Sequence, residues 1–302
     1  MSGKIIFNNQ NAHRRAGDFG GYADPSGRGV EMNKLNLFAP QWQDSGSTNE
    51  LYSGAVALKG YFESIGVFPI SEVKISEKKM PVIGNNILGY DILKQQLSAI
   101  HATLLNSQSN KIMAIGGGCG IEVPIVSYLL QQHPKLQVIW FDAHGDLNSP
   151  ESSPSKYFHG MPLRFIVERQ NNEIGMQYNL LDPSNVCLVG TRDLDPPEED
   201  FIESRKIKVV SLSENYWGEI KTAVKRGVPT YIHVDLDVID PQEYKNVKCP
   251  VLKGLSIADL ERSIDCFLTG TEIIGMSIVE NIETDASKIR KLHGIFERAI
   301  SI

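Results

Sequence analysis

The sequence of 302 residues lacks long apolar runs, paired cysteines and an excess of positive charge. No stretch approaches the length of a membrane span, and the first residues, MSGKIIFNNQNAHRR, contain no apolar segment typical of a signal peptide. The four cysteines are widely spaced, which favours reduced thiols and a cytoplasmic location. A formal net charge of −6 argues against nucleic acid or an anionic membrane as a partner.

The chain has the composition of an ordinary globular protein, with 41% hydrophobic and 22% charged residues. Its length suits one large α/β domain, and no repeat, low-complexity tract or linker divides it. We therefore expect a single domain over residues 1–302. The segment 1–35 is polar and rich in glycine, and we expect it to be irregular.

Apolar, β-branched runs alternate with segments of helical period along the rest of the chain. We expect strands within residues 34–40, 111–118, 136–144, 185–193, 207–213, 230–240 and 272–281. We expect helices within residues 54–66, 87–107, 121–134, 258–270 and 287–300. This alternation predicts a mainly parallel β-sheet with helices on both faces, and such sheets bind ligands at the carboxyl ends of their strands.

Acidic side chains and one histidine follow two of the expected strands. Asp142, His144 and Asp146 alternate in VIWFDAHGD, and Asp235 and Asp237 repeat the spacing in YIHVDLDVIDP. Side chains two apart on a strand share a face, so each group would point in one direction. Carboxylates gathered at the rim of an apolar sheet repel each other unless a cation neutralises them. The pattern therefore predicts a divalent metal centre, with two ions, and its oxygen-rich ligands favour Mn²⁺.

Each motif taken alone is also compatible with a turn that ends a strand. The two together favour a metal site, because two unrelated turns rarely both carry acidic residues spaced two positions apart. Asp240, just before Pro241, suits a turn better than a metal ligand. The glycine-rich segment 116–120 is not a phosphate loop, since no Lys-Ser/Thr follows it. We expect a tight turn there with Cys119 pointing inward, although a lone cysteine is often a small core residue.

These motifs occur in the order found in the ureohydrolase family of arginases, agmatinases and formiminoglutamases. The chain resembles the arginase branch over roughly residues 110 to 300, in several separate motifs. The resemblance implies two Mn²⁺ ions held by Cys119, Asp142, His144, Asp146, Asp235 and Asp237. Asp142 and Asp235 match the bridging carboxylates, while His144 and Asp237 match further ligands of one ion. Cys119, with Asp146, belongs to the other ion and replaces the family's histidine; Gly118 replaces an aspartate.

The same resemblance implies a substrate site for a guanidino amino acid. Asn148 and Ser155 resemble the residues that hold the α-carboxylate of arginine, and Asp195 resembles the acid that receives the α-amino group. Glu280 resembles the acid that grips the guanidinium. Cys249 stands where arginases carry a threonine near the substrate's head.

The implied reaction is hydrolysis of L-arginine, or of a modified arginine such as Nω-hydroxy-L-arginine, to urea or a urea derivative plus ornithine. The catalytic residues would be His159, which resembles the proton-shuttling histidine, with Asp146, Asp237 and Glu280. Cys119 leaves open whether the site holds two ions, one ion or a metal other than Mn²⁺. The family's relatives form trimers or hexamers, so the resemblance also implies a homo-oligomer.

Three alternatives remain open. The chain could be a non-catalytic or weakly active relative that binds an amino acid or a partner. It could instead have agmatinase or formiminoglutamase activity. Cys119 could also act as a covalent nucleophile, but nearby carboxylates without metal would raise the pKa of its thiol and oppose this.

Overall fold

The computed structural model describes residues 33–46, 48–79 and 82–302, which belong to one compact unit. The expected irregular segment 1–35 lies outside these residues, except for its last three. Within the described ranges, no helix combines the length and apolar character needed to cross a membrane.

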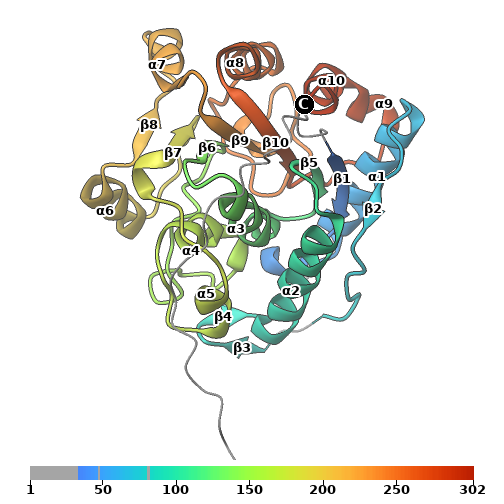
Figure 1. Ribbon diagram of the computed structural model, residues 1–302, viewed down its shortest axis with the longest axis vertical. Helices are drawn as coiled ribbons and strands as arrows, with labels where there is room; N and C mark the ends of the chain where they lie inside the picture. The colour runs from blue at the N-terminus through green and yellow to red at the C-terminus, as the bar shows by residue number, and fades with distance from the viewer. Residues whose placement is uncertain (1–32, 47, 80–81) are drawn as a thin grey trace, which may run out of the picture. The chain divides into compact units, whose positions relative to one another are not determined.

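An eight-stranded sheet forms the centre of the domain (Figure 1). Its spatial order is β2 (Ser71–Glu72), β1 (Lys34–Ala39), β5 (Lys111–Gly116), β10 (Glu272–Val279), β9 (Pro229–Asp235), β6 (Gln137–Phe141), β7 (Val186–Val189) and β8 (Lys208–Val210). Every neighbouring pair in this sheet is parallel, as the alternation of strands and helices predicts. A separate antiparallel pair is formed by β3 (Ile83–Gly84) and β4 (Ile87–Leu88).

Helices cover both faces of the sheet, each over its own apolar core (Figure 1). One face packs against α2 (Tyr90–Ser107), α3 (Glu122–Gln132), α4 (Pro162–Val167), α5 (Glu173–Gln177) and α6 (Pro196–Arg205). The other packs against α1 (Glu50–Ser64), α7 (Tyr216–Ala223), α8 (Ile257–Gly270) and α10 (His293–Ile300). All five residues of β6 are buried and four of them are apolar, because helices cover both faces of the central strands. The predicted α/β fold with helices on both faces is confirmed.

Two of the differences from the sequence-based prediction concern β9 and the C-terminal helix. The strand expected to run to residue 240 ends at Asp235, and Leu236–Val238 forms a 3-10 turn instead. The expected C-terminal helix is divided into α9 (Ala286–Ile289), a 3-10 turn and α10. The first change matters for the site, because Asp237 lies in the turn and its side chain need not point in the same direction as that of Asp235.

Candidate active site

Four neighbouring strands bring the predicted ligands together at one edge of the sheet. β6 and β9 pair in parallel with Phe141 opposite Val234, so Asp142 and Asp235 follow at the same level. β10 lies beside β9 and is followed by Glu280, while β5 leads into the turn that carries Cys119. The convergence follows from parallel pairing, which places all these strand ends on one side.

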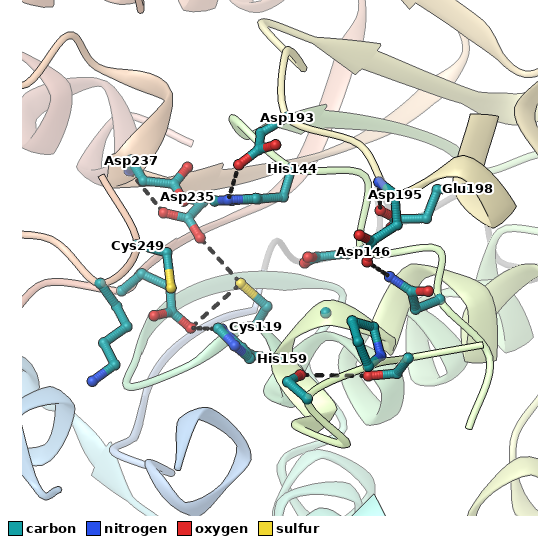
Figure 2. A pocket seen from close by; sticks show the side chains of 17 residues that line it. Cys119, His144, Asp146, His159, Asp193, Asp195, Glu198, Asp235, Asp237 and Cys249 are labelled. Atoms are coloured by element: carbon teal, nitrogen blue, oxygen red, sulfur yellow. Dashed lines mark hydrogen bonds and ion pairs between the residues drawn. The ribbon is translucent and has the colours of Figure 1, made fainter. Parts of the chain in front are cut away.

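The side chains surround a cavity of about 190 Å³ (Figure 2). Asp142 is fully buried and does not line the cavity. All other site residues predicted from the sequence line it: Cys119, His144, Asp146, Asn148, Ser155, His159, Asp195, Asp235, Asp237, Cys249 and Glu280. The cavity therefore brings together both the residues expected to hold metal and those expected to hold substrate.

A first group of possible ligand atoms comes from Asp142, His144 and Asp237, within 4.8 Å of one another. His144 Nδ1 lies 2.9 Å from Asp237 Oδ2, and the backbone N–H of His144 donates to Asp142 Oδ1 at 2.7 Å. Burial opposes a charge on His144, but hydrogen bonds to both carboxylates outweigh it and raise its pKa to about 12. The carboxylates of Asp142 and Asp237 would attract a metal cation in the same way as they attract the protonated imidazole.

A second group joins Cys119, Asp142, His233 and Asp235, again within 4.8 Å. Cys119 Sγ lies 3.3 Å from Asp235 Oδ2 and 3.7 Å from Glu280 Oε1, and the side chain is almost fully buried. Asp142 belongs to both groups. Each group thus combines residues from both sequence motifs. Asp235 and Asp237 fall into different groups, because the chain changes from β9 to the 3-10 turn between them.

Asp146 lies outside both of these groups. Its side chain is buried and lines the cavity, and within the described chain Oδ2 has no hydrogen-bond partner. Its backbone adopts a φ of 52°, a left-handed conformation unusual for a residue with a side chain. Ligation of a metal by Asp146 stays a prediction.

The electrostatics of the cavity fit bound cations. Burial, with the charges of Asp237 and Asp142, holds the pKa of Asp235 well above its usual range. Burial and the charge of Asp142 raise the pKa of Asp237 to about 6. Burial and the neighbouring carboxylates Asp146 and Asp235 likewise raise the pKa of the Cys119 thiol. These buried carboxylates cannot all be ionised unless a cation neutralises them. Together with the thiol of Cys119 they form a set of donors that suits a divalent metal ion.

Asn148 and Asp195 form a polar pair on the side of the cavity away from Cys119. Asn148 Nδ2 donates to Asp195 Oδ2 at 2.8 Å, and Glu198 accepts hydrogen bonds from the backbone N–H of Asp195 and of Leu147. Figure 2 shows Asp195 and Glu198 together beyond Asp146. The N-terminus of α6 thus fixes this pair, because Asp195 is its N-cap residue.

Glu280 lies at the opposite side of the cavity. Ser45 Oγ donates to Glu280 Oε1 at 3.2 Å, and His159 Nδ1 lies 3.5 Å from the same oxygen. Within the described chain Oε2 is buried without a hydrogen-bond partner, so it is available to a cationic group. Glu280 and Cys249 both have left-handed backbone conformations, with φ of 65° and 54°.

Several residues of the site were missed by the sequence analysis. Asp44 and Ser45 follow β1 and are buried against the Cys119 turn, where Asp44 Oδ2 accepts a hydrogen bond from Gly120 N at 3.0 Å. Asp193 and Lys248 line the cavity. The position of Asp44 after a parallel strand is the signal that could have revealed it. Asp240 has the expected turn role, accepting hydrogen bonds from the backbone of Gln242 and Gly254.

Comparison with known proteins gives consistent results. A model of the Arginase family matches residues 49–287. The arginase of Staphylococcus aureus strain MRSA252 is 28% identical over 252 residues, which cover 78% of this chain and 83% of that protein. The arginase of S. aureus strain COL is 34% identical over 178 residues, covering 56% of this chain and 59% of that protein.

Solved structures share the fold. The arginase of Bacillus caldovelox has a TM-score of 0.74 at 23% identity and covers 87% of this chain and 97% of its own. A putative agmatinase from Clostridium difficile has a TM-score of 0.68 at 16% identity, and the match covers 89% of this chain and 96% of that protein. Since the family model matches most of its length, the chain belongs to the arginase family, whose members are hydrolases that cleave a guanidino C–N bond.

Proposed function

We propose that the protein hydrolyses the guanidino group of L-arginine or of a modified arginine such as Nω-hydroxy-L-arginine, giving urea or a urea derivative plus ornithine. The observation that carries the proposal is a single cavity lined by Glu280 at one side and by Asn148, Ser155 and Asp195 at the other. Such a cavity offers an acid for the guanidinium and polar groups for the α-amino acid end. A small guanidino amino acid is therefore the proposed ligand.

The metal ligands would be those predicted: His144 and Asp237 for one ion, Cys119 and Asp146 for the other, with Asp142 and Asp235 shared. Bound divalent ions, Mn²⁺ by resemblance, would neutralise these buried carboxylates and lower the pKa of a water molecule so that it can attack at neutral pH. Whether the site holds two ions, one ion or a metal other than Mn²⁺ depends on Cys119, because a thiolate is softer than imidazole.

The chain's own side chains would orient the substrate and move protons. The free oxygen of Glu280 would accept hydrogen bonds from the guanidinium, and its burial would strengthen them. Asp195 would receive the α-amino group, and Asn148 and Ser155 the α-carboxylate. His159, close to Glu280, would carry a proton to the leaving amine.

Cys119 favours a modified guanidine over arginine itself. A hydroxylated guanidine has altered basicity and an extra oxygen. The replacement of a histidine ligand by Cys119 would change the metal site in a way that could suit such a substrate. A second candidate is a weakly active or non-catalytic relative that binds an amino acid, and the same Cys119 substitution is what favours it. Agmatinase activity is less well supported, since agmatine lacks the carboxylate that Asn148 and Ser155 would bind. Trimeric or hexameric assembly stays a prediction.

A substrate panel tests the proposal. L-arginine, Nω-hydroxy-L-arginine and agmatine are each incubated with Mn²⁺-loaded protein, and ornithine, urea, hydroxyurea and putrescine are measured. We expect ornithine from at least one of the two amino acids and no putrescine from agmatine. Cys119→His restores the family's ligand and should raise the rate on L-arginine; Cys266→His, at a partly exposed cysteine outside the cavity, is the control.

Three results would contradict the proposal or its metal centre. Putrescine formation as fast as ornithine formation would show that the α-amino acid end is not recognised. A thermal shift with arginine but no product from any substrate, in either the native protein or Cys119→His, would identify a binding protein. Full activity after exhaustive chelation would instead favour Cys119 as a covalent nucleophile.

A further inference from the structure

His233 is a buried histidine that neither the motifs nor the proposed mechanism uses. It lies on β9 two residues before Asp235, so both side chains point to the same face of the sheet. Its side chain is fully buried, and it belongs to the group of possible ligand atoms around Cys119. A histidine there supplies an imidazole to the same group in which Cys119 replaces the family's histidine.

The imidazole of His233 is anchored through one nitrogen only. Nδ1 lies 3.1 Å from Glu122 Oε1, and Ser277 Oγ lies 3.4 Å from the same nitrogen. A carboxylate accepts hydrogen bonds, so the contact with Glu122 places the hydrogen on Nδ1. Nε2 has no hydrogen-bond partner in the described part of the chain, although it is buried. Metal-binding histidines typically show this arrangement, with a carboxylate holding the far nitrogen.

The ring orientation is fixed by its neighbours on the adjacent strand. Trp140, opposite His233 on β6, stacks on the imidazole with ring centroids 3.7 Å apart and planes inclined by 23°. The Trp140 indole N–H donates to Asp142 Oδ2 at 3.0 Å. His233 Nε2 lies 3.8 Å from that same oxygen, which is too far for a hydrogen bond. A cation between them would satisfy both atoms.

We propose that His233 is a metal ligand, oriented by Glu122, and that it supplies the imidazole missing at position 119. The inference deepens the proposed function and rests on its metal centre. Cys119, His233, Asp142 and Asp235 give one sulfur, one nitrogen and two carboxylates, a set that suits Zn²⁺ or Co²⁺ better than Mn²⁺. The group of Asp142, His144 and Asp237 has no sulfur and suits Mn²⁺.

Cobalt binding tests the ligand set independently of activity. The purified full-length protein is stripped with chelator and titrated with Co²⁺, and the thiolate-to-cobalt charge-transfer absorption and the bound metal are both measured. We expect the native protein to show the band, and His233→Gln to lose it or to need roughly 100-fold more Co²⁺, the upper end of the cost of removing even a residue that only orients a metal ligand. His144→Gln is the matched control, because it removes an imidazole from the other group and should keep the band.

Glu122→Gln provides a second variant in case His233→Gln does not fold. It keeps the imidazole but removes the charge that holds Nδ1, and we expect it to weaken Co²⁺ binding at the thiolate site by about 10- to 100-fold. Zn²⁺ should displace this Co²⁺ at lower concentration than Mn²⁺ does.

The outcomes separate this inference from the proposed function. If His233→Gln and Glu122→Gln both bind Co²⁺ with native affinity and spectrum, His233 is a core residue and the inference is wrong, while the metal centre stands. If the native protein binds no metal at all, the metal centre of the proposed function fails as well.

Discussion

Asp195 combines a structural position with the proposed recognition of the substrate. It is the N-cap residue of α6 and is hydrogen bonded to Asn148. Asn is as good an N-cap as Asp, so Asp195→Asn should leave the stability of the protein almost unchanged. The lost charge should raise KM for the amino acid substrate by about 10- to 100-fold, the value of a charge-assisted hydrogen bond. Steady-state kinetics measure this, and an unchanged KM would remove Asp195 from the substrate site.

Asp44 occupies the space that a side chain at position 118 would need. A Cβ atom added at Gly118 would collide with both carboxylate oxygens of Asp44. Burial and the charge of Glu280 raise the pKa of Asp44 to about 7, so the pocket already resists one charge. The Asp44 carboxylate thus lies where an aspartate at position 118 would be.

A double-mutant cycle tests this exchange. Gly118→Asp alone should destabilise the protein, because it forces two buried carboxylates together. Combined with Asp44→Ala, the same change should cost less, with a coupling free energy of about 1–3 kcal/mol measured by urea unfolding. Additive effects of the two substitutions would show that the side chains do not share the space.

Single residues show which parts of the site were accessible from the sequence. Asp142 and Asp235 were predicted to converge because each follows a buried strand, and the structure confirms that they do. Asp44 was missed because an isolated acid in QWQDSG has no partner nearby in sequence. His233 was not singled out because a lone histidine inside an apolar strand gives no signal in the sequence, and its contacts with Glu122 and Trp140 appear only in the structure.

Helix α1 supports the site through a close backbone contact. A Cβ atom at Gly54 would overlap the carbonyl of Asn281, which directly follows Glu280. Asn281 Nδ2 in turn donates to the carbonyl of Gly54 at 2.9 Å. The helix therefore lies directly against the segment that presents Glu280 to the cavity.

A pair of substitutions in α1 tests this contact. Gly54→Ala should destabilise the protein by about 1–3 kcal/mol, the usual cost of overpacking, and should lower activity by displacing Glu280. Gly60→Ala, in the same helix with open space around it, should instead stabilise by about 0.4–1 kcal/mol. Urea unfolding of both variants checks the sign, and equal effects would contradict the packing argument.

Strands were predicted better than the turns that follow them. The runs of residues 136–144 and 272–281 contain β6 and β10, since apolar, β-branched runs are typical of buried parallel strands. The residues after Asp235 were expected to continue the strand, but the side chain of Asp235 accepts a hydrogen bond from the backbone N–H of Asp237 at 2.7 Å. This side-chain contact starts the 3-10 turn, and apolar periodicity does not report it.

The whole domain explains why ligands distant in sequence can form one site. Residue 119 and residue 235 are separated by 116 positions but lie in contact, because β5, β10 and β9 are adjacent in the sheet. Buried carboxylates gather at this edge of the sheet, and Asp142 belongs to both groups of possible ligand atoms. Loss of the Asp142 carboxylate should therefore weaken cation binding at both groups.

Elemental analysis is the most direct test of the central claim that carboxylates from β6 and β9 jointly hold divalent metal. Native protein and Asp142→Asn are purified without chelator, loaded with Mn²⁺, desalted and analysed for bound transition metal. We expect stoichiometric metal in the native protein and a large loss in Asp142→Asn, which keeps the side-chain volume but not the charge. Native protein without any transition metal, or a variant that retains as much as the native protein, would contradict the account.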